Sequence, residues 1–325
     1  MRTISRRLEA GTDVLLGTKS VHAALLSGER PLKRLLLDRE HADGRLAPLE
    51  TLARERAVRV ELVERAVLEQ LAKGGRKDQG VALFAGPRPL ERITALEASD
   101  WTAPPQQQVS SAVAREQLGS LSSLDVKSAL ESWLLDDTDG AEGDAAREEA
   151  RDKAREGKQA TGGPAPAPVV VGAHRIHDPQ NLGAICRSAL FFGAQRLVLS
   201  EARGTLSRVT SAVSSASAGA AEFLRMAQAV SFVQFLRESR ANGWAVVGTG
   251  AVAGGRRVAT DDLRAIAKPL ILVLGNEGEG LPREVAEECD WSCVIGRSGA
   301  HGADNLDSLN VGVAAGILLH AATSC

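Results

Sequence analysis

The second half of the chain alternates between short apolar runs and segments of helical period, and this alternation limits the possible folds more than any other feature. After Pro168 the runs VVVGA, RLVLS, WAVVGTG, PLILVLG and SCVIG are typical of buried strands. Strands that alternate with helices form a parallel sheet covered on both faces. Ligands of such sheets bind at the carboxyl ends of the strands. We therefore expect an α/β domain over residues 168–325 with its site at that edge.

The segments between these runs predict the helices of the same domain. They are AICRSALFFG, the region around SSASAGAAEFLRMA, VSFVQFLRESRANG, LPREVAEEC and SLNVGVAAGILLHAA.

A smaller α/β domain is expected over residues 14–99. SVHAALLSG predicts a helix that ends at Gly28, and LAPLETLARERAV predicts a second, amphipathic one. LKRLLLD, VRVELV and QGVALFA predict strands. Residues 1–13 form a tail, whose beginning MRTISRR is compatible with a mitochondrial presequence or with an ordinary disordered terminus.

Residues 100–167 differ in composition from both flanks. The stretch contains QQQ, DDTDGAEGD, AREEARDKAREGKQ and TGGPAPAP in succession, and it carries 7 basic and 13 acidic side chains. Its periodic apolar surface is too small to offset the entropy cost of ordering, so we interpret it as an acidic linker or insertion outside the site. Residues 1–99 carry 18 basic and 14 acidic side chains, which is compatible with an RNA partner and with ordinary solvated charge alike.

Length and composition exclude several classes of protein. No apolar run is long enough to cross a bilayer, so we expect no membrane partner. The four cysteines lack the paired spacing of a zinc site and are too few for a disulfide framework, so we expect neither a metal nor an oxidising compartment.

Three short motifs stand at the strand-to-helix junctions of the second half. The first, DPQNLGAICRSA at 178–189, places Asn181 and Arg187 on either side of Gly183, so that both could face the strand ends. Taken alone, the same residues are equally compatible with a helix cap and a surface arginine.

The second motif, LILVLGNEGEGLP at 270–282, runs from a buried strand into a loop with three glycines in six residues. Such a loop exposes backbone groups to a small polar ligand. It is not a phosphate loop, because no Gly-Lys-Ser/Thr follows and two carboxylates would repel phosphate. It does not match the dinucleotide fingerprint either, because it comes late in the domain.

The third motif, DSLNVGVAAGILLH at 307–320, opens the last helix with Ser308 and Asn310. Ser308 in isolation predicts a helix N-cap. The small residues that follow indicate close packing against another element or subunit.

Together, in this order and at these junctions, the motifs resemble the SpoU (TrmH-like) family of the SPOUT methyltransferase superfamily. Residues 214–223, SSASAGAAEF, are also similar to a helix of that family. The resemblance covers about 155 residues. It implies a trefoil knot made by the C-terminal segment, a homodimer, S-adenosylmethionine as cofactor, and transfer of its methyl group to a ribose 2′-hydroxyl.

The resemblance also implies roles for individual residues. Gly275, Ile295 and Leu309 would bind the cofactor through their backbone. Arg187 would act on the hydroxyl, as a base if its site perturbs it strongly and otherwise by stabilising the developing alkoxide. The remaining polar positions of the site would be Asn181, Glu277, Ser308 and Asn310: the first two would position Arg187 or an RNA phosphate, and the last two the hydroxyl or the cofactor.

One departure from the family lies beside the expected cofactor pocket. Where many relatives have Ile-Pro-Met after the last strand, this chain has Ile295-Gly296-Arg297 and then the long loop SGAHGADNLD. His301 in that loop is interpreted as a solvent-exposed residue and not as a catalyst.

The first domain resembles the small substrate-binding domain, similar to ribosomal protein L30e, that precedes the knot in ribosomal-RNA members of the family. The resemblance implies large-subunit ribosomal RNA as the substrate, as in bacterial 23S guanosine methyltransferases and their mitochondrial counterparts, with the mitochondrion or else the cytoplasm as location. The candidates for phosphate contact are Arg30, Lys33, Arg34, Arg76 and Lys77.

Two alternatives remain open at this point. The chain could methylate transfer RNA, because the catalytic motifs do not read the substrate. It could also be a non-catalytic RNA-binding or ribosome-assembly factor. An oxidoreductase or an α/β hydrolase is disfavoured, because the chain lacks an early dinucleotide turn and a GxSxG elbow.

Overall fold

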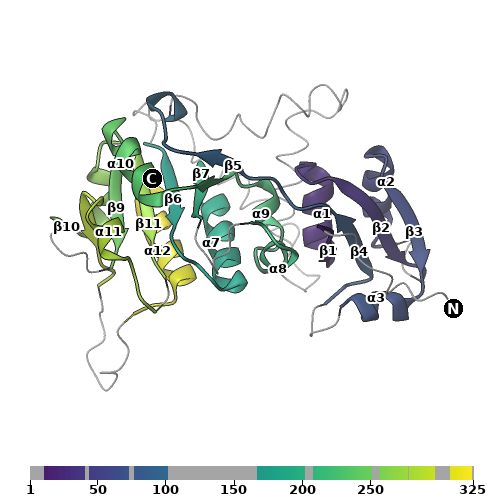
Figure 1. Ribbon diagram of the computed structural model, residues 1–325. Coiled ribbons are helices and arrows are strands. Elements are labelled where there is room, and N and C mark those ends of the chain that lie inside the picture. Colours follow the sequence, from purple (N-terminus) through teal and green to yellow (C-terminus); the bar gives the residue numbers. More distant parts are fainter. Residues whose placement is uncertain are drawn as a thin grey trace, which may run out of the picture. The chain divides into compact units, whose positions relative to one another are not determined.

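The computed structural model describes residues 11–40, 44–72, 77–101, 167–201, 208–250, 256–276, 278–296 and 308–323. All of them lie in one compact unit of the chain. Within it the strands form two separate sheets, one of four strands and one of eight (Figure 1).

The smaller sheet is built by the first part of the chain. Its strands, in the order β1-β4-β2-β3, are β1 (Asp13–Leu16), β4 (Val81–Ala85), β2 (Leu32–Asp38) and β3 (Arg59–Val63). Only β2 and β3 pair in parallel. The helices are α1 (Thr18–Ser27), α2 (Ala47–Glu55) and α3 (Arg65–Leu71). The expected end of α1 is confirmed, because Gly28 takes a left-handed conformation (φ 65°) that suits glycine.

The larger sheet is parallel throughout, as the alternating sequence pattern predicted. Its strands, in the order β10-β12-β9-β11-β6-β7-β8-β5, are β10 (Arg256–Val258), β12 (Trp291–Cys293), β9 (Ala245–Thr249), β11 (Leu270–Leu274), β6 (Val169–Ala173), β7 (Arg196–Ser200), β8 (Met226–Ala229) and β5 (Glu91–Ile93).

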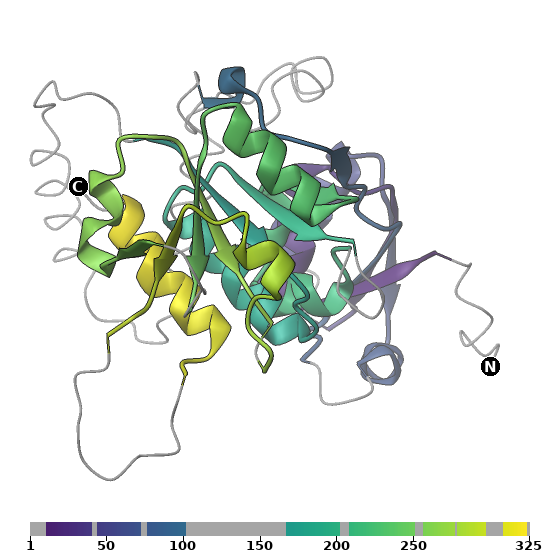
Figure 2. The same ribbon diagram turned by 60° about the vertical axis from the view of Figure 1, so that its left-hand side comes forward.

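Helices cover both faces of this sheet. One face is covered by α7 (Pro179–Phe191), α8 (Ser211–Ala216) and α12 (Val311–Thr323), and the other by α10 (Phe232–Ala241) and α11 (Arg283–Ala286). Helices α7 and α12 pack side by side (Figure 2). Because α7 follows β6 and α12 follows the loop after β12, the starts of both helices lie near the carboxyl edge of the sheet.

The expected single helix around SSASAGAAEFLRMA is wrong. The segment contains α8, the short helix α9 (Ala220–Phe223) and then strand β8. The helix cannot continue through Ala218 and Gly219, because both residues have positive φ (52° and 88°). The run that follows is nearly all buried, and such a short apolar run cannot be distinguished from a helix by its period.

The sequence placed residues 14–99 in the first domain, but strand β5, which lies within this range, belongs to the larger sheet. It pairs in parallel with β8 at the edge of the larger sheet. The chain then continues to the one-turn helix η1 (Ala98–Trp101), and the buried Leu96 receives a hydrogen bond at its backbone carbonyl from the Asn242 side chain. A strand of three residues with two exposed side chains has no periodic signal, so only its pairing reveals it.

The sequence did not predict β1, α3, β10 or the 3₁₀ helix η3 (Thr260–Ala265). Each of these elements is short, and its conformation depends more on packing against neighbouring elements than on the periodicity of its own sequence. In the part of the chain that the structure describes, no helix combines the length and apolar character needed to cross a membrane.

Candidate functional site

Helix α7 starts five residues earlier than its apolar pattern indicated, and this places Asn181 in its first turn. The Asp178 side chain caps the helix by accepting a hydrogen bond from the Gln180 N–H at 2.9 Å, and Pro179 stands at the first helical position. Asn181 is buried, with 9% of its surface exposed. It lies one strand-to-helix turn beyond the carboxyl end of β6.

Asn310 is the N-cap of α12, a role that the sequence had assigned to Ser308. Its Oδ1 atom accepts hydrogen bonds from the N–H groups of Gly312 (2.9 Å) and Val313 (3.3 Å). The helix begins at Val311, so Ser308 is two residues too early to cap it, and Ser308 is exposed. The expected cap is therefore corrected by two residues.

The first and third motifs meet through their asparagines. The Nδ2 group of Asn310 donates to Oδ1 of Asn181 at 2.8 Å, although 129 residues separate them in sequence. The approach is close because Gly312 has no side chain, and a Cβ there would lie 2.8 Å from Cβ of Ala184. This contact joins the first turns of α7 and α12.

The second motif forms a closed loop after β11. The N–H of Asn276 donates to the Gly280 carbonyl at 3.1 Å, and the N–H of Gly280 donates back to the Asn276 carbonyl at 3.0 Å. The side chain of Asn276 accepts from the N–H groups of Gly278 and Glu279 and donates to the Arg175 carbonyl at 3.0 Å. Asn276 therefore holds the loop against the end of β6.

Asn276 was not among the residues predicted from the sequence, where the glycines of this loop were the signal. An asparagine that precedes a Gly-rich turn is a known signal for a side chain that hydrogen-bonds to the backbone two residues on. That signal was present in the chain. Gly275 itself is buried, and a Cβ there would lie 2.6 Å from the carbonyl carbon of Gly280, so only glycine fits.

Each of the three predicted cofactor residues lies next to a strand end or a helix start. Gly275 follows β11, Ile295 follows β12, and Leu309 precedes α12. Strands β11 and β12 both flank β9, so the three segments lie at the same end of the sheet. Ile295 packs partly against the core, and Leu309 is 47% exposed. Backbone groups beside apolar side chains suit a ligand that has an aromatic base and a thioether-like chain.

Arg187 lies six residues along α7 from Asn181 and is exposed, whereas Asn181 is buried. The two residues therefore differ in burial, and the prediction that both face the strand ends stays a prediction for Arg187. Six residues rotate the chain by about 240° along a helix, which brings the two side chains to different sides of it. Arg187 is on the same side as Phe191, one turn further on, and the Phe191 side chain is 64% exposed.

Several predicted residues lie outside the described part of the chain: Glu277, Arg297, His301 and Arg76.

The candidate phosphate contacts of the first domain divide into two groups. Lys33 and Lys77 are exposed and Arg34 is half-buried, with its guanidinium 4.3 Å from the centre of the Phe84 ring. Arg30 is only 3% exposed and pairs with Glu222. Arg30 therefore does not contact phosphate, and this prediction is wrong because sequence spacing does not reveal burial between domains.

The carboxyl edge also contains a buried histidine that the sequence did not single out. His174 follows β6, and its backbone N–H donates to the Leu274 carbonyl. The centre of its ring lies 5.0 Å from that of the Phe232 ring. Burial, and to a smaller extent the charge of Arg175, lower the pKa of His174 to about 4. The imidazole is therefore neutral at physiological pH.

The three cysteines that the structure describes, Cys186, Cys289 and Cys293, are buried. Burial raises the pKa of the Cys186 thiol to about 12, and burial together with Asp290 raises that of Cys289 to about 12. A thiol of this kind is a poor nucleophile and a poor metal ligand at neutral pH. Among the described residues, no three side chains of His, Cys, Asp or Glu gather as a metal site.

Two family models match the chain. Residues 168–320 match the SpoU rRNA methylase family, and residues 14–90 match the RNA 2′-O ribose methyltransferase substrate-binding domain.

Among curated proteins, the chain is similar to proteins named mitochondrial rRNA methyltransferase 1. It is 40% identical to that of Dictyostelium discoideum over 45% of this chain and 27% of the relative, and 34% identical to that of Homo sapiens over 52% and 49%. A protein of Mycobacterium avium, named an uncharacterized tRNA/rRNA methyltransferase, is 36% identical over 50% of this chain and 48% of its own length. The chain thus spans half or less of these relatives.

Solved structures share the fold over nearly the whole chain. An rRNA methyltransferase from Sinorhizobium meliloti with bound AdoMet has a TM-score of 0.57 at 21% identity, and covers 96% of this chain and 87% of its own. The SpoU methyltransferase AviRb from Streptomyces viridochromogenes has a TM-score of 0.59 at 18% identity, with 97% and 89% covered. At these identities the likeness concerns the fold.

Proposed function

We propose that the chain is an S-adenosylmethionine-dependent RNA methyltransferase, because residues 168–320 match the SpoU rRNA methylase family and residues 14–90 match the RNA 2′-O ribose methyltransferase substrate-binding domain. Its substrate is the ribose 2′-hydroxyl of a guanosine in large-subunit ribosomal RNA. The observation that carries the proposal is the Asn181–Asn310 contact of 2.8 Å, which joins the helices of the first and third motifs beside the closed loop of the second.

The residues suited to hold the cofactor are Gly275, Ile295 and Leu309. The buried Gly275 offers backbone groups, and the partly exposed Ile295 and Leu309 offer apolar surface. When bound, S-adenosylmethionine supplies a methyl group on a positively charged sulfur, which needs no metal for its transfer. Asn276 supports the site indirectly, because its side chain holds the loop that follows Gly275.

Arg187 is proposed to act on the ribose hydroxyl. A guanidinium is almost always protonated, so its role is to orient the hydroxyl and stabilise the negative charge that develops on its oxygen. The exposed Ser308 supplies a hydroxyl that hydrogen-bonds to the substrate or cofactor. Asn310 has a positioning role instead, because its amide already caps α12 and binds Asn181. Glu277 remains a proposed partner of Arg187 or of RNA.

A homodimer is proposed through the joint face of α7 and α12. Three large apolar side chains are exposed there: Phe191 (64%), Val313 (53%) and Ile317 (37%). A second copy of the chain is the occupant that family membership favours, and it would cover the region around Arg187. Sedimentation velocity of the wild type and of Phe191→Asp tests this. We expect a dimer that the charge converts to a monomer, and a monomeric wild type would contradict the proposal.

A trefoil knot is also proposed, formed by the C-terminal segment around β9, β11 and β12. The adjacency of β12, β9 and β11 in the sheet and the packing of α12 against η3 are consistent with it. Location in the mitochondrion is proposed from the names of several relatives, with the cytoplasm as the alternative. Imaging of the full chain with a C-terminal fluorescent tag in its source cells tests the location.

The substrate is tested by mapping ribose methylation in large-subunit ribosomal RNA and in transfer RNA, with and without the gene. Loss of one 2′-O-methylguanosine from ribosomal RNA is the expected result. If the ribosomal RNA pattern is unchanged and a methylated site is lost from transfer RNA, transfer RNA is the substrate. Unchanged patterns in both RNAs would contradict the proposal.

A further inference from the structure

Arg30, just before strand β2, forms a buried ion pair with Glu222 of α9. Its Nε atom lies 2.8 Å from Glu222 Oε2, and its Nη2 atom lies 2.9 Å from Glu222 Oε1. Both side chains are 0% exposed. The pair connects the two matched domains, because Arg30 lies within residues 14–90 and Glu222 within residues 168–320.

Arg30 also donates hydrogen bonds to other acceptors in both domains. Nη1 donates to Asp13 Oδ2 at 3.1 Å and to the Gly86 carbonyl at 3.3 Å, while Nη2 donates to the Val209 carbonyl at 3.0 Å. The guanidinium is planar and its donors have fixed directions, so these contacts determine orientation as well as distance. A second arginine repeats the pattern.

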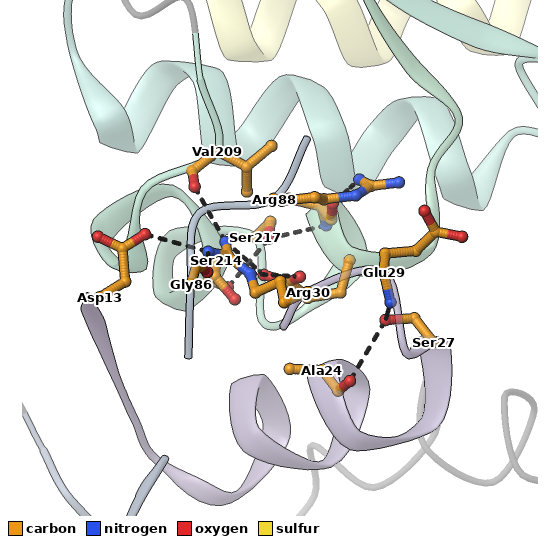
Figure 3. A network of polar contacts seen from close by, with 12 residues as sticks. Asp13, Ala24, Ser27, Glu29, Arg30, Gly86, Arg88, Val209, Ser214 and Ser217 are labelled. Atoms are coloured by element: carbon orange, nitrogen blue, oxygen red, sulfur yellow. Dashed lines mark hydrogen bonds and ion pairs between the residues drawn. The ribbon is translucent and has the colours of Figure 1, made fainter. Parts of the chain in front are cut away.

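That second residue is Arg88, which is 6% exposed. It donates from Nη1 to the Ala221 carbonyl and from Nη2 to the Leu224 carbonyl at 2.9 Å. Two buried arginines from the first domain thus bind the same α9 segment of the second (Figure 3). We name Arg30, Arg88 and Glu222 the domain clamp.

A buried ion pair is not explained by stability alone. The cost of removing both charges from water is often as large as their attraction, whereas the fixed geometry specifies one arrangement. A flexible connection between the domains would not require it. The clamp therefore has the properties of a device that holds the two domains in one orientation.

The clamp is close to the proposed catalytic helix. Helices α8 and α9 both pack against α7, which carries Asn181 and Arg187. The contact is tight at Gly183, where a Cβ would lie 2.4 Å from Cβ of Ala216 and 2.8 Å from the backbone nitrogen of Ser217. A shift of α8 relative to α7 would therefore meet steric resistance, and α9 follows α8 after three residues.

We propose that Arg30 is a positioning residue: the domain clamp holds the RNA-binding domain rigidly on α8 and α9, so that bound RNA is presented to α7 in a single orientation. This inference rests on the proposed function for its RNA ligand. The rigidity of the two domains is independent of the proposed function, because it can be measured without RNA.

The test removes both charges at once in the full chain, with Arg30→Met and Glu222→Gln. The single Arg30→Met variant would leave a buried, unpaired carboxylate and could fail to fold, which the double variant avoids. The matched control is Arg92→Met with Glu201→Gln. This pair lies at 2.7 Å and joins β5 to the residue after β7 within the larger sheet, and its side chains are 61% and 42% exposed.

Rigidity is read from the distance between two spin labels, at Leu62→Cys in β3 and at Val230→Cys after β8. Both side chains are about half exposed (46% and 51%), whereas Cys186, Cys289 and Cys293 are buried. Cys325 is replaced by serine, and labelled protein is diluted with unlabelled protein to suppress distances between subunits. We expect one narrow distribution in the wild type and the control, and a broad one in the clamp variant.

Function is read with a transcript of large-subunit ribosomal RNA and radiolabelled S-adenosylmethionine. The Arg30 side chain is fully buried, so the clamp variant should lose about 10- to 100-fold in kcat, while the Kd values for RNA and cofactor change less than about 2-fold. A direct phosphate contact would instead raise the Kd for RNA and spare kcat.

Two results would overturn the proposal: an equally narrow distance distribution in the clamp variant, or a broad one with wild-type kcat. If the wild type itself methylates no transcript, the proposed function fails. The distance measurement then still decides whether the clamp holds the domains.

Discussion

The Nδ2 group of Asn310 lies 2.8 Å from Oδ1 of Asn181, and this hydrogen bond fastens the first turn of α12 to that of α7. The same Asn310 side chain caps α12 through its oxygen. One amide thus joins the first turns of two helices.

Replacing Asn310 with alanine should lower the free energy of unfolding by about 1–3 kcal/mol, because the variant loses both the cap and the bond to Asn181. Urea denaturation measures the change. Ser308→Ala is the matched control and should change the free energy by less than about 0.5 kcal/mol, since Ser308 is exposed and does not cap the helix. Equal losses in both variants would contradict the assignment of the cap.

Two glycines inside helices should respond to alanine in opposite directions. Gly183→Ala should destabilise the protein by about 1–3 kcal/mol, because the new Cβ would lie 2.4 Å from Cβ of Ala216. Gly316→Ala should stabilise it by up to about 1 kcal/mol, because the nearest atom, Ser188 Oγ, is at an ordinary 3.6 Å and alanine favours helix. Thermal unfolding of both variants checks the contrast. A stabilised Gly183→Ala variant would refute the close packing of α7 on α8.

Stability should fall in acid because of His174. Burial lowers its pKa in the folded protein from 6.5 to about 4, so between these values the unfolded chain binds a proton that the folded protein does not. The free energy of unfolding therefore decreases as the pH falls from about 6.5 to 4, by at most about 3 kcal/mol from this group. Above pH 6.5 the group makes no contribution to the pH dependence.

Urea titrations at several pH values of the wild type, His174→Leu and the control His177→Gln test this. The His174 variant should lose less stability over the window, and the exposed His177 variant should behave as the wild type. An unchanged acid dependence in His174→Leu would show that other groups cause it.

Arg187→Ala should reduce kcat by about 100-fold or more, because the side chain is proposed to stabilise charge that develops only during transfer. The fold should be unaffected, since Arg187 is exposed, and the Kd for S-adenosylmethionine should change less than about 2-fold. Calorimetry and single-turnover methylation measure the two quantities. Arg187→Lys, which retains the charge without the planar geometry, should recover part of the rate. Near-wild-type turnover in the alanine variant would exclude this role.

The sequence predicted the central part of the fold well. Strands β6, β7, β9, β11 and β12 are apolar runs that end at junctions, and a buried parallel strand leaves a strong signal of this kind. The three motifs were found for the same reason, because each follows a strand or opens a helix. The Asn181–Asn310 contact itself was not predicted, since no local pattern encodes a partner 129 residues away.

Elements that depend on distant partners were missed or misplaced. Strand β5 has three residues and exists through its pairing with β8, which the sequence pattern suggested to be helix. Arg30 was expected at the surface because arginine usually is, and only the position of Glu222 explains its burial. Arg187 and Asn181 were both expected to face the strand ends, but they are six residues apart in α7 and therefore lie on different sides of that helix.

The proposed methyl transfer is tested most directly by digesting ribosomal RNA to nucleosides after incubation with the pure protein and S-adenosylmethionine labelled in the methyl group. The account predicts that the label appears in 2′-O-methylguanosine from large-subunit RNA, and that Arg187→Ala protein leaves the RNA unlabelled. Label on a base, or none on any RNA while the cofactor still binds, would contradict it.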